Sequence, residues 1–154
     1  MFQIRNLTSD DYGFAVKLAN TMNWNMAAED FAYMASLEPE GSFLLLEELK
    51  PVGIATCISY GKVGWFGNLI IDPASRKKGA GSMLVHHAID YLHIKGVETV
   101  GLYAYPHLKD FYGKIGFKKD VDFALLKADK IAPIEASGVH RIEEENLPRI
   151  AAFD

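Results

Sequence analysis

The residues with the clearest chemical potential form one short segment in the middle of the chain. It holds three cations and two glycines within seven positions: Arg76-Lys77-Lys78-Gly79-Ala80-Gly81-Ser82. A helical pattern of apolar residues follows from 79 to 93, so the segment lies at a helix N-terminus, where free N–H groups and the helix dipole attract anions. Glycine lets the backbone approach an anion closely. The segment therefore predicts a phosphate or pyrophosphate site, with a solvated turn as the alternative.

Two other phosphate motifs fit the spacing poorly. A P-loop requires a lysine before its Ser or Thr, whereas Gly81 is followed directly by Ser82. A dinucleotide-binding fingerprint requires a third glycine where Leu84 stands, and it normally opens a parallel sheet. The P-loop is excluded, and the dinucleotide fingerprint is only a weak alternative.

Length and composition indicate a compact domain. The chain has 154 residues, of which 49% are hydrophobic and 23% charged, as in globular proteins. A net charge of −4 favours neither nucleic acid nor an anionic membrane as a partner. The lone Cys57 excludes an intrachain disulfide, and its apolar surroundings predict a core position. No segment has the length of a membrane span or a signal-peptide core, so a cytoplasmic protein is expected.

The hydrophobic pattern places the cationic segment between a strand and a helix. Strands are expected at 2–7, 42–48, 51–60, 63–72, 97–103 and 116–130. Helices are expected at 9–22, 27–37, 79–93 and 106–115. Tight turns make the strands from 42 to 72 antiparallel, and the later strand–helix–strand order implies one parallel pair. The predicted class is α/β (α+β) with a mixed, mostly antiparallel sheet.

Two motifs together resemble the GCN5-related N-acetyltransferase (GNAT) superfamily. The cationic segment after Leu69-Ile70-Ile71-Asp72-Pro73 is similar to the family's acyl-coenzyme A loop, [Arg/Gln]-x-x-Gly-x-[Gly/Ala]. Phe111-Tyr112-Gly113-Lys114-Ile115-Gly116-Phe117 is similar to its Tyr-x-x-x-Gly-Phe element. The resemblance covers about residues 2 to 130, and we expect an acyl-CoA N-acyltransferase domain at 1–130. It implies helices on both faces of the sheet and a splay between the fourth and fifth strands.

The resemblance also implies how acetyl-CoA binds. The backbone N–H groups from Arg76 to Ser82 would wrap the pyrophosphate, and the exposed backbone of Leu69, Ile70 and Ile71 would pair with the pantetheine arm. Phe111 would pack near the coenzyme. Tyr112 matches the tyrosine that often protonates the departing thiolate, with a tyrosine that only packs on the sheet as the alternative. The family needs no metal.

The implied function is an N-acetyltransferase (EC 2.3.1.-) that moves an acetyl group directly from acetyl-CoA to a primary amine of a small molecule or peptide. The fourth strand lacks the carboxylate that many members use as a base, so the base stays open. Candidates are a water chain or one of the side chains Asp30, Glu47, Glu48 and His107. This departure keeps a non-catalytic acyl-CoA-binding or sensor module as the alternative function.

Acceptor candidates are fewer. Trp24-Asn25 lies in the segment that usually forms part of the acceptor cleft in this fold. Together with Leu102-x-Ala104-x-Pro106, it resembles a subgroup of acetyltransferases with an extra C-terminal domain. Tyr60 and Tyr105 are further candidates for lining this cleft, although aromatic residues on strands are more often core. Tyr105 also departs from the family, because many relatives carry asparagine there.

Two further features lie outside the site. His86, Asp90 and His93 share one helix face with metal-ligand spacing, but this face is opposite the apolar stripe and is expected to be solvated, with no metal. In the extension 131–154, the apolar residues Val139, Ile142, Leu147 and Ile150 repeat, at an offset of 135, the positions Ile4, Leu7, Tyr12 and Ala15. We expect the truncated start or remnant of a second domain, or an arm that packs on a partner subunit in a homodimer.

Overall fold

The computed structural model describes residues 1–122, 138 and 140–152. The chain divides into two compact units, Met1–Lys119 and Asp120–Asp154. The domain boundary expected between residues 130 and 131 lies outside the described residues and stays a prediction.

The first unit is built on one five-stranded sheet with the strand order β1-β2-β3-β4-β5. Its strands are β1 (Phe2–Asn6), β2 (Ser42–Glu47), β3 (Lys50–Tyr60), β4 (Val63–Ile71) and β5 (Thr99–Gly101). Neighbouring strands from β1 to β4 pair antiparallel, whereas β4 and β5 pair parallel. The predicted mixed, mostly antiparallel sheet is therefore confirmed.

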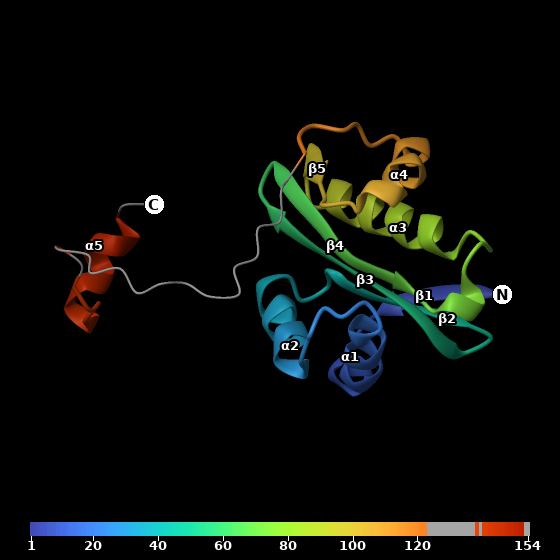
Figure 1. The fold of residues 1–154 in the computed structure, drawn as a ribbon, viewed down its shortest axis with the longest axis horizontal. Helices are drawn as coiled ribbons and strands as arrows, with labels where there is room; N and C mark the ends of the chain where they lie inside the picture. Colours follow the sequence, from blue (N-terminus) through green and yellow to red (C-terminus); the bar gives the residue numbers. More distant parts are fainter. Residues whose placement is uncertain (123–137, 139, 153–154) are drawn as a thin grey trace. The chain divides into compact units, whose positions relative to one another are not determined.

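Helices cover both faces of this sheet. They are α1 (Tyr12–Asn20), α2 (Ala28–Leu37), α3 (Ala80–Ile94) and α4 (Lys109–Ile115), with the 3-10 turns η1 (Ser9–Asp11), η2 (Pro73–Ser75) and η3 (Pro106–Leu108). Figure 1 shows α1 and α2 against one face and α3 and α4 against the other. No helix in the described part of the chain is long and apolar enough to cross a membrane.

Strand alternation divides the core between the two faces. Leu44, Ile54 and Ile70 are buried with residues of α1 and α2. Their sequence neighbours, such as Ala55 and Ile71, are buried with the apolar stripe of α3. Two separate apolar layers thus hold the strands between them, and Ile70 and Ile71 of β4 face opposite sides of the sheet.

Cys57 and the candidate metal residues lie where the sequence indicates. Cys57 is 2% exposed in the α3-side core, and burial raises the pKa of its thiol to about 12. His86, Asp90 and His93 are all exposed on α3. The thiol is therefore a core group, and the histidine face is solvated.

Glu38, which follows α2, accepts a backbone hydrogen bond of β3 that a neighbouring strand would otherwise accept. Its carboxylate accepts hydrogen bonds from the Ser59 backbone N–H at 3.0 Å and the Tyr91 hydroxyl at 2.5 Å, and it pairs with Lys95 at 3.2 Å. Burial raises the pKa of Glu38, but these hydrogen bonds outweigh it, so the pKa lies below the ordinary value. The carboxylate therefore satisfies the edge of β3 beyond the end of β2 and joins α2 to α3.

Two expected strands differ from the structure. The strand expected at 97–103 is reduced to the three residues of β5, because its only partner in the described chain, β4, pairs with it only as far as Gly101. Residues 117–122 of the strand expected at 116–130 are not in a strand, and residues 123–130 lie outside the described part.

The second unit contains η4 (Glu144–Asn146) and α5 (Leu147–Ala151). Both begin 135 positions after their counterparts η1 and α1, so the offset seen in the sequence is also present in the structure. Each 3-10 turn is closed in the same way. The Thr8 N–H donates to the Asp11 carboxylate, and the Glu143 N–H donates to the Asn146 side-chain oxygen, both at 2.9 Å. This unit therefore reproduces locally the turn and helix start of the first.

Candidate active site

The central feature of the site is a splay between β4 and β5. Pairing extends only from Val63 opposite Thr99 to Trp65 opposite Gly101. From residue 66 to 71, β4 remains paired with β3 but has no partner strand on its other side within the described residues. The expected splay is therefore present, and among the described residues no strand covers the edge of β4 that faces away from β3, so an extended ligand can pair there.

A β-bulge bends β4 just beyond this point. Ile54 faces Ile70 but Thr56 faces Gly67, so β4 has one extra residue opposite β3. Asn68 within the bulge has a left-handed backbone, with φ of 50°. Its side-chain amide donates to Thr56 Oγ1 at 3.0 Å and to Met34 Sδ at 3.2 Å. These contacts fix the bulge and tie it to α2.

The predicted anion-binding segment forms the other half of the site, and we call residues 72–82 the anion loop. Asp72 accepts a hydrogen bond from the Ala74 N–H and starts the η2 turn at Pro73. Lys77 and Gly79 then take left-handed conformations, with φ of 62° and 84°. None of the backbone N–H groups from 77 to 82 donates to another described residue, and the first helical bond of α3 joins Met83 N–H to Gly79. Alternating handedness and N–H groups without a described acceptor are the features of a backbone nest, and nests of this kind can bind anions.

Hydrogen bonds to Glu47 and Ile71, which lie outside residues 72–82, fix the conformation of the anion loop. Glu47, at the end of β2, accepts from Ser75 Oγ at 2.6 Å and from Lys78 Nζ at 2.9 Å. These two hydrogen bonds lower the pKa of Glu47 below its ordinary value. Arg76 Nε donates to the carbonyl of Ile71 at 2.9 Å, so this carbonyl is already occupied. The loop geometry therefore depends on Glu47 and Ser75, which sequence reasoning did not identify as a pair.

The ends of β4, α3 and α4 meet beside the anion loop. A Cβ added at Gly81 would lie 3.4 Å from Phe111 Cζ and 3.9 Å from Ile71 Cγ1. Tyr112 is 7% exposed, and its ring contacts Phe111 and Phe117 edge to face, with centroid distances of 4.9 and 5.8 Å. Burial raises the pKa of Tyr112, so its hydroxyl keeps its proton at neutral pH. The structure therefore brings together three residues expected at the coenzyme and places the candidate acid next to one of them.

Four aromatic residues lie around the same strands, and we call Trp24, Trp65, Tyr103 and Tyr105 the aromatic group. Trp24 Nε1 donates to the Tyr105 hydroxyl at 2.9 Å across 81 positions of sequence. The rings of Trp65 and Tyr103 meet edge to face at 4.7 Å. Trp24 and Tyr105 were both expected near the acceptor, and the structure joins them directly.

The remaining acceptor and base candidates are scattered. Asn25 follows Trp24 with φ of 58°. Tyr60 ends β3 opposite Val63 and is 64% exposed, and no hydrogen bond or ring contact in the described chain joins it to Trp24 or Tyr105. Asp30 accepts from the Ala27 N–H, and Glu48 lies in the β2–β3 turn. Of the four base candidates, His107 is the one that stacks on the aromatic group, with its ring 5.7 Å from that of Tyr105.

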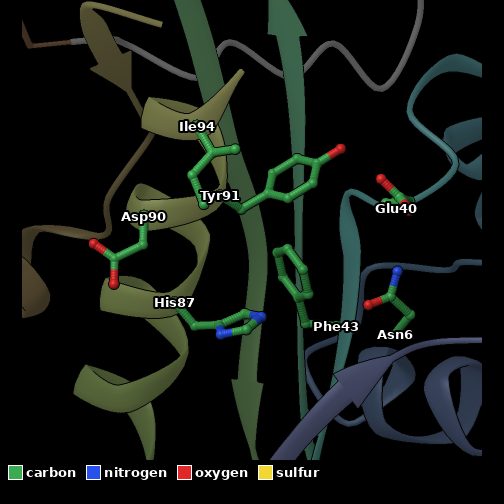
Figure 2. A pocket seen from close by; sticks show the side chains of 7 residues that line it. All are labelled: Asn6, Glu40, Phe43, His87, Asp90, Tyr91 and Ile94. Atoms are coloured by element: carbon green, nitrogen blue, oxygen red, sulfur yellow. The ribbon is translucent and has the colours of Figure 1, made fainter. Parts of the chain in front are cut away.

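A groove of about 390 Å³ lies elsewhere, between α3 and the β1–β2 part of the sheet. It is lined by Asn6, Glu40, Phe43, His87, Asp90, Tyr91 and Ile94. Figure 2 shows the rings of His87 and Tyr91 turned toward Phe43, while the Asp90 carboxylate points away from them. This groove is separated from the splay by β3 and β4 and contains none of the residues expected in the site.

Comparisons with known proteins identify the family. The Acetyltransferase (GNAT) family matches residues 2–117. An uncharacterized N-acetyltransferase of Methanocaldococcus jannaschii is 26% identical over 140 residues, covering 77% of this chain and 61% of that protein. The GCN5-related N-acetyltransferase 1, chloroplastic, of Arabidopsis thaliana is 31% identical over 55 residues, or 36% of this chain and 28% of that protein. The chain therefore belongs to the GNAT acetyltransferase family.

Solved structures agree on the fold. An acetyltransferase of Pyrococcus horikoshii has a TM-score of 0.70 at 24% identity, covering 77% of this chain and 44% of that one. The glucosamine-6-phosphate N-acetyltransferase of Arabidopsis thaliana has a TM-score of 0.67 at 22% identity, covering 84% and 99%. The chain thus spans less than two thirds of the length of the M. jannaschii protein and of the P. horikoshii protein.

Proposed function

We propose that this chain is an N-acetyltransferase that moves the acetyl group of acetyl-CoA directly onto a primary amine. The observation that carries the proposal is the junction of two features at one end of the sheet. The N–H groups from 77 to 82 have no acceptor among the described residues, and they follow the part of β4 beyond Trp65 whose only described partner strand is β3. An anionic pyrophosphate fits the first feature, and an extended amide-containing chain fits the second.

Acetyl-CoA would bind with its pyrophosphate on the anion loop. Lys77 adds positive charge there, while Lys78 and Arg76 also hold the loop through Glu47 and Ile71. The pantetheine arm would add to the open edge of β4 at Leu69, Ile70 and Ile71, and Phe111 would pack beside it. The N–H and C=O groups of successive residues alternate between the two sides of a strand, and the Ile71 carbonyl also accepts from Arg76, so only part of the backbone groups in this stretch would pair with the arm.

The chemistry balances as a direct transfer. At pH 7 an alkylammonium with a pKa near 10.4 is only about 0.04% neutral, so the amine must first lose a proton. We assign that proton to water or to His107, which stacks on Tyr105. The amine nitrogen then attacks the thioester carbonyl, a C–N bond forms, and the C–S bond breaks. The sum is R-NH3+ and acetyl-CoA giving the acetamide, free coenzyme thiol and one H+.

Tyr112 is the proposed acid for the departing thiolate. Burial raises its pKa, so the hydroxyl stays protonated and can donate as the sulfur gains charge. A thiolate with a pKa near 8.5 is already a tolerable leaving group, so the acid adds a moderate factor and not the whole rate enhancement.

Similar proteins carry names with different acceptors, such as glucosamine-6-phosphate N-acetyltransferase and N-acetylglutamate synthase. The acceptor of this chain is therefore argued from its own residues. One observation favours a non-catalytic acyl-CoA-binding module as the second candidate, namely that β4 presents Trp65, Gly67 and Asn68 near the splay and no carboxylate.

The test measures thiol release from acetyl-CoA with a panel of amines, polyamines, amino acids and peptides, alongside coenzyme affinity by calorimetry. We expect thiol release that depends on an amine acceptor and a matching acetylated product by mass spectrometry. Tight coenzyme binding without acceptor-dependent release from any amine would establish the binding module instead.

A further inference from the structure

The aromatic group is held in place by a loop with a well-defined conformation. Trp24 lies between α1 and α2, and its two neighbours Asn23 and Asn25 both have left-handed backbones, with φ of 57° and 58°. Asn20 closes the loop, because its side chain donates to the Met26 carbonyl at 3.0 Å and accepts from the Met26 N–H at 2.8 Å. The indole is therefore presented by a fixed loop and then bonded to Tyr105.

The two aromatic pairs lie on the same side of the sheet. Phe66 is buried in the α3-side core, so Trp65 points to the opposite face, toward the side of α1 and α2. Gly101 lies under the Trp65 ring, since a Cβ added there would be 2.7 Å from Trp65 Cζ3. Tyr103 and Tyr105 continue from Gly101 and remain 66% and 45% exposed. Exposed aromatic faces thus accumulate where β5 leaves β4.

The anion loop and the segments that carry the aromatic group differ sharply in their content of basic residues. The anion loop carries Arg76, Lys77 and Lys78 in succession. The chain from the end of α1 through α2 and β2 contains no Lys or Arg between Lys17 and Lys50. The first turn of α2, which follows the loop that carries Trp24, contains Glu29 and Asp30. The segment 99–108, which contains Tyr103 and Tyr105, has no Lys or Arg either. The segments that carry Trp24, Tyr103 and Tyr105 therefore hold aromatic and acidic residues and no Lys or Arg, whereas the anion loop is basic.

Aromatic faces and carboxylates both attract ammonium ions, and the quadrupole of tryptophan is the strongest among the aromatic side chains. A carboxylate or phosphate on the acceptor would instead be stabilised by a Lys or Arg, and these segments contain neither. We propose that the acceptor is a cationic alkylamine or arylalkylamine without an anionic group, and that the hydrogen-bonded pair Trp24 and Tyr105 determines this specificity. The inference rests on the proposed N-acetyltransferase function and names the substrate class of that site.

Matched acceptors test the charge part of the proposal. The probes are tyramine against tyrosine, cadaverine against lysine, and glucosamine against glucosamine 6-phosphate, with tyrosinamide as a control that restores bulk without charge. We expect kcat/KM to be at least tenfold higher for the member of each pair that lacks the carboxylate or phosphate, and tyrosinamide to follow tyramine. Preference for the carboxylate or phosphate member would overturn the inference while leaving the transferase function intact. Coenzyme binding without thiol release from any amine would overturn both.

Conservative variants test the bonded pair. Trp24→Phe and Tyr105→Phe each remove the hydrogen bond but keep an aromatic ring. We expect each to raise the KM for tyramine about three- to tenfold, with kcat within twofold and coenzyme affinity unchanged. The double variant should be no worse than the more affected single variant, because both remove the same bond. Tyr33→Phe, at a 65% exposed tyrosine of α2, is the control. An unchanged KM in both single variants would remove the pair from acceptor recognition.

Discussion

The anion loop and the aromatic group lie beside the same splay but are built in different ways. The loop presents backbone N–H groups, and its shape comes from left-handed conformations at Lys77 and Gly79, on either side of Lys78. The aromatic group presents side chains from segments far apart, joined by one hydrogen bond between Trp24 and Tyr105. A ligand that never changes can be bound by a local backbone motif. A ligand that differs between relatives is better bound by side chains that can be exchanged without altering the backbone.

The largest expected effect is at Tyr112, the proposed acid, which belongs to neither the anion loop nor the aromatic group. Tyr112→Phe keeps the ring between Phe111 and Phe117 but removes the proton donor. We expect kcat to fall about 10- to 100-fold, at the low end of general acid effects, because the thiolate is already a tolerable leaving group. Coenzyme affinity should change less than threefold. Steady-state kinetics and calorimetry provide both values, and an unchanged kcat would exclude Tyr112 from the mechanism.

The second largest effect is expected at Gly79, where the backbone of the anion loop is altered without changing its charge. Gly79→Ala leaves the side-chain charges intact, and there is open space around the new Cβ. A left-handed alanine costs about 1–2 kcal/mol, so we expect acetyl-CoA affinity to fall about tenfold. The KM for the amine should be unaffected.

Gly61→Ala is the matched control for this experiment. Gly61 has a similar φ of 76°, against 84° at Gly79, and also lies in open space, but it belongs to the β3–β4 turn. Both variants should lose similar stability in thermal unfolding, while only Gly79→Ala should lose coenzyme affinity. Equal affinities in the two variants would contradict the assignment of the N–H groups to the pyrophosphate.

The smallest expected effect concerns the aromatic group. Gly101→Ala would place a Cβ 2.7 Å from Trp65, so the indole must shift. We expect the KM for tyramine to rise about threefold and tryptophan fluorescence to change, with coenzyme affinity within error. Gly13→Ala, with nothing near its added Cβ, is the control. A loss of coenzyme affinity in Gly101→Ala with no change in the KM for tyramine would show that the two regions are not separable.

The contrast between the regions also explains what the sequence could predict. The anion loop was predictable because its glycines, cations and following helix are contiguous, and the parallel pair followed from element order. Glu47 was considered only as a base, because its bonds to Ser75 and Lys78 span 28 and 31 positions and leave no local pattern. The bond between Trp24 and Tyr105 spans 81 positions, so only their separate positions were predictable.

The length of β5 escaped prediction for a related reason. Residues 102 and 103 have the apolar and aromatic character of a strand, but in the described chain the pairing of β5 with β4 ends at Trp65 opposite Gly101, so the strand stops before them. Tyr60 ends β3 opposite Val63, as the strand expected at 51–60 indicates, and its role toward the acceptor stays a prediction. Pairing and register are properties of the whole sheet, and composition does not report them.

The Glu38 carboxylate makes one backbone amide a reporter of charge. Ser59 N–H is bonded to this side chain and not to a neighbouring strand, so its hydrogen exchange should depend on the ionisation of Glu38. Since the pKa of Glu38 is held below its ordinary value, the contribution of the ionised carboxylate is present at neutral pH and is lost only as the pH falls through that lowered value. Ser59 would then exchange faster in acid than the neighbouring ladder amides of β3, and its NMR signal would follow the detachment of α2 from α3 before the sheet itself opens.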